Sequence, residues 1–170
     1  MSIAIILGII AIGVIGYSQL DSLPPNVSSP KENEEPTAQN VACDQSLWTH
    51  VYNTERLQII DNCKTVSGFI ETIRVEKDGD YHIGLKLDLQ YADLVNESNM
   101  KNQNGNLVVE VICQRPVTQQ DAIGACANFS QHIDIPPLGT HVRVTGSYVL
   151  DKQHGNWAEI HPVSSIEKIQ

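Results

Sequence analysis

The sequence predicts a mainly β fold: five strands, with one short helix between the third and the fourth, preceded by an apolar helix and a disordered linker. Two observations predict it. Runs in which apolar and polar residues alternate recur between residues 64 and 166, and turn signals separate them. Residues 117–128 interrupt this series with the composition of a short helix, in which Thr118 is a suitable N-cap. This element order is typical of a small Greek-key barrel.

The N-terminal segment, residues 1–20, carries no charged side chain. It predicts either a signal anchor or a signal peptide, for which Gly16 and Ser18 stand at suitable cleavage positions. Residues 21–42 are rich in Pro, Ser, Asn and Glu and are expected to form a flexible linker. The sequence therefore predicts a domain at residues 43–170 outside the cytoplasm, either tethered to the cell membrane by a single span or secreted.

The cysteines support export of the chain. An even count of four indicates disulfides, and we expect Cys43–Cys63 and Cys113–Cys126, because each pair is close in sequence. A four-cysteine zinc site is the alternative, although no C-x-x-C pair is present. Three N-x-S triplets, which would fit an exported glycoprotein, begin at Asn26, Asn96 and Asn128.

The expected strands follow a lead-in at residues 43–63, read as a short helix or irregular segment. The first, residues 64–76, has Gly68 in its interior, which suggests a bulge or a bend. An Asp-Gly turn joins it to the second, residues 80–88, where alternation is nearly complete. One face of this strand carries Tyr81, Ile83, Leu85 and Leu87, and the other carries Asp80, His82, Gly84, Lys86 and Asp88.

The remaining strands are expected at residues 107–114, 141–151 and 156–166. The passage "LGTHVRVTGSYV", residues 138–149, resembles the fourth strand of OB-fold domains, in which a glycine turn leads into V-x-V-x-G. This resemblance covers residues 63–167 and implies an OB-like five-stranded barrel without implying an activity.

The last expected strand contains the most concentrated set of chemical groups in the chain, "HGNWAEIHPV". Strand alternation places Ala158 and Ile160 on the inner face, and Trp157, Glu159 and His161 on the outer face. Polar residues on an outer face are expected in any half-exposed strand, so this arrangement is also consistent with a purely structural role.

A metal or acid–base site is the functional interpretation of the same residues. Glu159 and His161 could chelate a divalent ion, the one cofactor that the sequence suggests, with His154 and His82 as further ligands. Asp80 completes the set of catalytic candidates. Whether these residues meet depends on the strand order, which the pattern does not determine.

The ending resembles the H-G-x-W-x-E-I-H-P pattern of OB-like domains in exported prokaryotic proteins of unknown function. In those domains the glycine is usually followed directly by the tryptophan, and the first position written x is an insertion, which is Asn156 in this chain. "DGD", residues 78–80, also resembles part of the active-site sequence of thermonuclease-like enzymes, which implies a calcium-binding carboxylate cluster and two arginines. The available groups are Asp78, Asp80, Asp88, Arg74 and Arg143, and neither arginine stands in the family pattern.

The charge of the chain narrows the choice of partner. A formal net charge of −9 without any lysine or arginine block argues against generic nucleic-acid binding. The leading hypothesis is a non-enzymatic domain that binds a small ligand or an envelope protein, with a metal-dependent hydrolase of nuclease or phosphodiesterase type and a structural envelope component as alternatives. The candidate ligand-binding residues are His82, Lys86, Trp157, Glu159 and His161.

Overall fold

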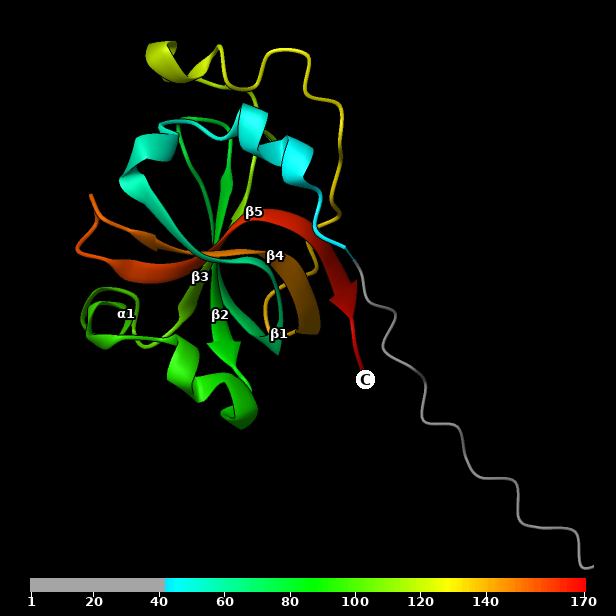
Figure 1. Cartoon of the computed structure of the whole chain (residues 1–170). Helices are drawn as coiled ribbons and strands as arrows, with labels where there is room; N and C mark the ends of the chain where they lie inside the picture. Colours follow the sequence, from blue (N-terminus) through cyan, green and yellow to red (C-terminus); the bar gives the residue numbers. More distant parts are fainter. Residues whose placement is uncertain (1–41) are drawn as a thin grey trace, which may run out of the picture. The chain divides into compact units, whose positions relative to one another are not determined.

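A computed structural model describes residues 42–170 (Figure 1). The predicted anchor or signal segment, residues 1–20, and nearly all of the predicted linker lie outside these residues. Within the described range, no helix has both the length and the apolar character that crossing a membrane requires. The described part is mainly β, as predicted. Its strands are β1 (Leu57–Val75), β2 (Tyr81–Leu87), β3 (Leu107–Val111), β4 (His141–Asp151) and β5 (Trp157–Lys168).

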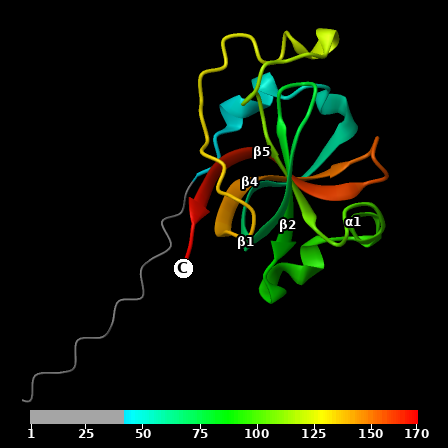
Figure 2. The same ribbon diagram turned by 180° about the vertical axis from the view of Figure 1, so that it is seen from behind.

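The five strands form one sheet in the order β1-β2-β3-β5-β4, in which β4 also pairs with β1. The pairing of β3 with β5 is parallel, and the other pairings are antiparallel. In the two opposite views, β4 and β5 lie side by side, and β5 leads to the C-terminus (Figures 1 and 2). The observed β4 has the bounds that the sequence predicts, whereas β1 begins at Leu57, inside the expected lead-in.

At Gly68 the pairing partner of β1 changes from β4, which pairs with the residues before it, to β2, which pairs with the residues after it. Gly68 itself is opposite Leu87 of β2 and also opposite Val142 of β4. A Cβ atom at this position would lie 2.2 Å from the carbonyl oxygen of Lys86, so the two backbones approach too closely for any side chain. The bend that the sequence suggests at this glycine therefore allows one long strand to pair on two sides.

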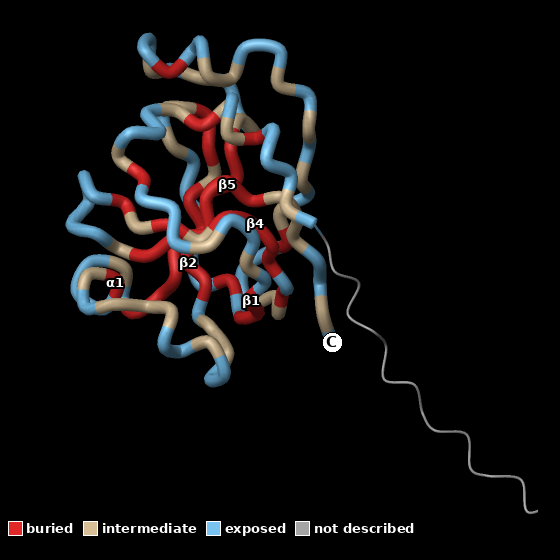
Figure 3. The backbone as a smooth tube through the Cα atoms, in the orientation of Figure 1, coloured by how far each residue is buried: buried red, intermediate tan, exposed pale blue. Residues whose placement is uncertain are grey.

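The core fills the space inside the ring of strands, where Figure 3 shows the buried backbone concentrated. Ile83 and Leu85 from the predicted inner face of β2 are buried there, as are Ala158 and Ile160 from β5. A second apolar cluster lies outside it. Its buried members come from the N-terminal segment, from the start of β1, from the residue after β3 and from β4: Leu47, Val51, Leu57, Ile112 and Val149.

The helices differ from the prediction. Between β3 and β4 only the three-residue 3-10 helix η4 (Gln120–Ala122) forms. The N–H groups of Thr118 and Gln119 both donate to the carbonyl of Lys77, so they fasten this segment to the β1–β2 turn instead of starting a helix. The one α-helix among residues 42–170, α1 (Glu97–Asn102), lies between β2 and β3, where Asn96 begins it with a capping box.

Short 3-10 helices complete the described fold. Two of them, η1 (Gln45–His50) and η2 (Thr54–Arg56), occupy the expected lead-in, and η3 (Leu89–Leu94) follows β2. The lead-in is thus helical only in its first part, because the chain joins the sheet at Leu57.

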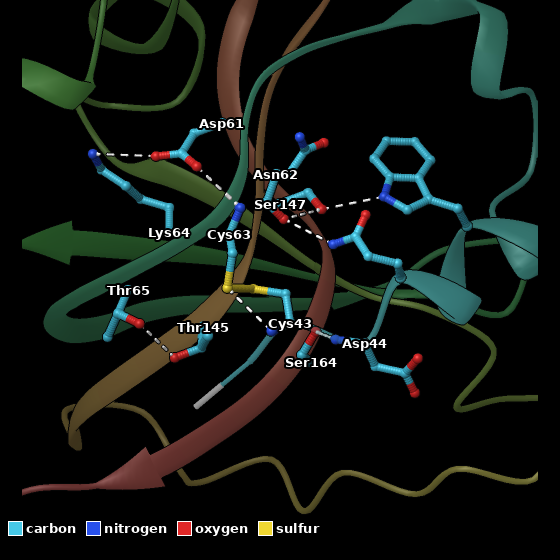
Figure 4. The surroundings of a disulfide bond; sticks show 12 residues. Cys43, Asp44, Asp61, Asn62, Cys63, Lys64, Thr65, Thr145, Ser147 and Ser164 are labelled. Atoms are coloured by element: carbon cyan, nitrogen blue, oxygen red, sulfur yellow. Dashed lines mark hydrogen bonds and ion pairs between the residues drawn. A yellow bond between two sulfur atoms is a disulfide. The ribbon is translucent and has the colours of Figure 1, made fainter. Parts of the chain in front are cut away.

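Both expected disulfides are present, Cys43–Cys63 and Cys113–Cys126, with Cα–Cα distances of 5.3 and 5.4 Å. Figure 4 shows the first, which joins the start of the described chain to β1, while the N–H of Asp44 donates to Ser164 of β5 at 3.0 Å. Two disulfides indicate an oxidising environment outside the cytoplasm.

The glycosylation triplets differ in accessibility. Asn128 is exposed, whereas Asn96 is half-buried and its side-chain amide donates to the carbonyl of Asn156 at 2.6 Å. Asn26 lies outside the described residues. Glycosylation itself stays a prediction.

Replacing Gly68 with alanine should destabilise the protein by about 1–3 kcal/mol, the usual cost of adding a methyl group to a filled space. Urea unfolding measures this change. Gly124→Ala is the matched control, because a Cβ at Gly124 would meet no atom within 4 Å. Equal stability of the two variants would contradict the role of Gly68.

Candidate functional site

Polar residues form a row across the outer side of β2, β3 and β5. His82 is opposite Glu110 in the antiparallel pairing of β2 with β3. In the parallel pairing, Val108 is opposite Glu159, so two residues further on Glu110 lies level with His161. The sequence prediction expected this face to be partly exposed, but all four polar side chains are buried, with exposures from 1% to 9%. The outer face of these strands is therefore a polar interior layer.

The buried groups are arranged as carboxylate–imidazole pairs. His82 Nδ1 lies 2.8 Å from Glu110 Oε1, and His161 Nδ1 lies 3.2 Å from Glu159 Oε2. Burial disfavours the charged imidazolium of His82, but the hydrogen bond and the charge of Glu110 outweigh it and raise the pKa. The Glu159–His161 pair behaves in the same way. Against the penalty of burial, Glu159 raises the pKa of His161, and His161 lowers the pKa of Glu159.

A third pair lies in the β4–β5 turn. His154 Nδ1 is 2.8 Å from Asp151 Oδ2, and the buried carboxylate of Asp151 also pairs with Arg56. The ring of His154 stacks on Trp157 with a centroid distance of 4.8 Å. The indole N–H of Trp157 donates to Glu159, which joins the turn to the buried pair on β5.

A cavity with a volume of about 540 Å³ lies beside these groups. Its walls are the β1–β2 turn, the β4–β5 turn, the segment before β1 and the outer sides of β2, β3 and β5. The lining side chains are Tyr52, Asn53, Arg56, Arg74, Glu76, Lys77, Asp78, His82, Glu110, Gln119, Gln153, His154, Trp157 and Glu159.

The structure brings four of the sequence-predicted site residues to this cavity: His82, His154, Trp157 and Glu159. His161 lies beneath it, completely buried, and its Nε2 atom has no hydrogen-bond partner. Lys86 is exposed further along β2 and does not line the cavity.

Asp80 is buried next to the site without lining the cavity, and its carboxylate accepts the N–H of Cys113 at 2.7 Å. Burial and the nearby Asp78 raise the pKa of Asp80 to about 8, so its carboxyl group is mostly protonated at neutral pH.

Three participants were not among the sequence candidates: Glu110, Asp151 and Arg56. A glutamate inside "LVVEV", an otherwise apolar run, is the signal that could have identified Glu110, because an unpaired charge is rarely buried. Asp151 and Arg56 carry no such signal. They meet only because β1 begins beside the end of β4, where Leu57 is opposite Asp151.

The candidate metal ligands do not form a three-ligand set. Within residues 42–170, the only three groups of metal-binding type with ligand atoms within 4.8 Å of one another are Asp80, Cys113 and Cys126, and both cysteines are in a disulfide. Trp157 contacts the imidazoles of both His82 and His154, at 6.0 and 4.8 Å between ring centroids.

The thermonuclease-like residues are also dispersed. Asp78 and Arg74 line the cavity, whereas Asp88 binds Ser67 and His141 at the other end of β2. Arg143 pairs with Glu167 on the exposed surface. The carboxylates and arginines that the sequence suggested for a thermonuclease-like site therefore do not converge.

Comparisons with known proteins add no assignment: no family model matches the chain, and neither a curated protein nor a solved structure does.

Replacing Glu159 with glutamine should destabilise the protein by about 3 kcal/mol near pH 6, because it leaves a buried imidazolium without its carboxylate. His161, with its raised pKa, contributes stability below pH 6.5 and loses it as the pH rises through that pKa. Glu159, with its lowered pKa, contributes above pH 4.5 and loses this as the pH falls. Urea unfolding at several pH values should therefore show a smaller effect of the mutation in alkali.

Glu167→Gln on the same strand is the control. Its side chain is about half exposed and pairs with Arg143 at 3.4 Å. Such a surface pair should change the free energy of unfolding by no more than about 1 kcal/mol. If Glu159→Gln were as mild as this control, the buried pair would not stabilise the layer.

Proposed function

We propose that residues 43–170 form an OB-type barrel that binds a hydroxyl-rich ligand, an oligosaccharide, in the cavity beside Trp157. The ring of pairings in the order β1-β2-β3-β5-β4 supports the barrel. In this proposal the domain acts outside the cytoplasm, and residues 1–20 are either its membrane anchor or its removed signal peptide. The likeness of the "HGNWAEIHP" ending to exported OB-like domains agrees with this placement but implies no activity.

The position of the cavity is the observation that carries the proposal. OB-type barrels bind oligonucleotides and oligosaccharides on the face of strands 2 and 3, between the loop joining strands 1 and 2 and the loop joining strands 4 and 5. The cavity has the same borders. Lys77 belongs to the β1–β2 turn, His154 to the β4–β5 turn, and His82 and Glu110 to β2 and β3.

The lining favours a sugar over a nucleic acid. Four carboxylates line the cavity, from Glu76, Asp78, Glu110 and Glu159, against three lysine or arginine side chains. Carboxylates repel phosphate groups, whereas they accept hydrogen bonds from hydroxyl groups. Trp157 supplies an apolar ring surface beside them, as sites that bind polar ligands in a concave pocket commonly do.

The alternative functions have less support. A metal-dependent hydrolase needs a ligand set, and the imidazoles of His82 and His154 are each engaged with a carboxylate and with Trp157. A structural envelope component would leave a cavity of this size and polarity without a role.

Tryptophan fluorescence tests the proposal. In the Trp48→Phe variant, Trp157 is the only indole left, and Trp48 lies in the separate cluster beside Ser147. Chitotriose, cellotriose and maltotriose are the probes. We expect at least one of them to change the Trp157 emission with a Kd in the millimolar range or tighter, about −4 kcal/mol.

Two variants locate the binding. Glu110→Gln should weaken it by at least about tenfold, equivalent to ~1.4 kcal/mol, because a charged acceptor is lost from the cavity. Lys86→Ala, on the adjacent strand but outside the cavity, should leave it unchanged. No response to any of the three sugars would overturn the sugar assignment, and binding of single-stranded DNA instead would favour the nucleic-acid reading.

A further inference from the structure

Asp80 and the Cys113–Cys126 disulfide form a compact group of metal-binding type. One carboxylate oxygen and the two sulfur atoms all lie within 4.8 Å of one another. In the part of the chain that the structure describes, no ion pair joins Asp80 to a lysine, an arginine or a histidine. Asp80 is 5% exposed, and the charged groups near it are Asp78, Glu110 and His161. A bound cation would replace the proton that this buried carboxyl group holds at neutral pH.

Contacts other than the disulfide bond also bring the three residues together. Asp80 ends the β1–β2 turn, and its carboxylate accepts the N–H of Cys113 at 2.7 Å, just beyond β3. Gly79 has a φ of +97°, and a Cβ there would lie 2.6 Å from the carbonyl oxygen of Arg115. The turn and the segment after β3 are thus held together by backbone packing and hydrogen bonds.

Cys126 approaches from the other end of the same loop. Its sulfur lies 3.6 Å from the carbonyl oxygen of Asp78, and Ala125 accepts a hydrogen bond from His50 at 2.8 Å if Nδ1 of that ring carries the proton. Separate contacts therefore hold each cysteine close to Asp80. Both are half-buried, so a small reagent can reach them.

We propose that reduction of the Cys113–Cys126 disulfide creates a site for one thiophilic divalent cation, of the zinc and cadmium class, with Cys113, Cys126 and Asp80 as ligands. A phosphine reductant supplies the two electrons: the S–S bond breaks, one water molecule gives its oxygen to the phosphine, and two thiols form. The cation then displaces a proton from each thiol, and the thiolates become its ligands. Two sulfurs and one oxygen leave one tetrahedral position for water.

The cation would replace the disulfide as the closure of loop 113–126. This role does not depend on the sugar ligand proposed above. It matters wherever the chain meets reducing conditions, since cytosolic thiols are kept reduced. Under reducing conditions, bonds from Cys113, Cys126 and Asp80 to the cation would hold the loop in place of the S–S bond.

Cadmium binding to the reduced full-length chain tests the site. In the Cys43→Ser/Cys63→Ser background, Cys113 and Cys126 are the only cysteines left. After reduction with a phosphine, we expect one Cd²⁺ per chain, seen as thiolate-to-cadmium charge-transfer absorption in the ultraviolet. Asp80→Asn should weaken this binding by at least about tenfold, since even losing a residue that only supports a metal ligand costs 10–100-fold.

Asp78→Asn is the matched control. Asp78 is a carboxylate two residues away that does not belong to the three-ligand group, so its removal should weaken the binding far less than Asp80→Asn does. Less than one Cd²⁺ per chain, or equal affinities of the Asp80→Asn and Asp78→Asn variants, would overturn the proposal.

A second measurement covers the case in which Asp80→Asn does not fold. Zn²⁺ should raise the thermal unfolding temperature of the reduced background protein, and Cys126→Ser should abolish that rise. No rise with Zn²⁺, or an equal rise after Cys126→Ser, would also overturn the site.

Discussion

The short parallel pairing between β3 and β5 is the contact on which the rest of the structure depends. It pairs Val108 with Glu159 and Val109 with Ile160. Through this pairing the last strand joins the three antiparallel strands β1, β2 and β3. Without it, β5 would be paired only with β4. Because the two strands run in the same direction, a step of two residues along each strand leads from the Val108–Glu159 pair to Glu110 and His161. These two residues therefore lie beside each other in the buried layer.

The buried layer is costly unless each charge has a partner, and the pairs on the three strands meet that condition. His82 and Glu110 pair across β2 and β3, and Glu159 and His161 pair along β5. His161 Nε2 is the exception, buried without a partner. The buried layer is therefore built from the sheet itself, whereas His154 and Lys77 at the rim of the cavity come from turns.

The sequence predicts the local features well, since each depends on near neighbours. Alternation in "DYHIGLKLD" identified the inner face of β2, and Gly68 marked the bend in β1. The first half of β1 escaped prediction because the residues after Leu57 are mostly exposed and its pairing with β4 shifts register twice, which removes any regular pattern. Burial of Glu159 and His161 also escaped prediction. Alternation assigns a residue to a face, but what covers that face depends on strand order.

The side chain of Asn99 has a consequence for the sheet. It is completely buried, its amide group donates to the carbonyls of Asn106 and Ala158, and its oxygen accepts the N–H of Ala158. One side chain from α1 thus continues the ladder between β3 and β5 where backbone pairing ends. Unpaired backbone at the margin of a sheet can recruit a strand from another molecule. Because Asn99 occupies the carbonyl groups of Asn106 and Ala158 and the N–H of Ala158, these groups are not free to pair with such a strand.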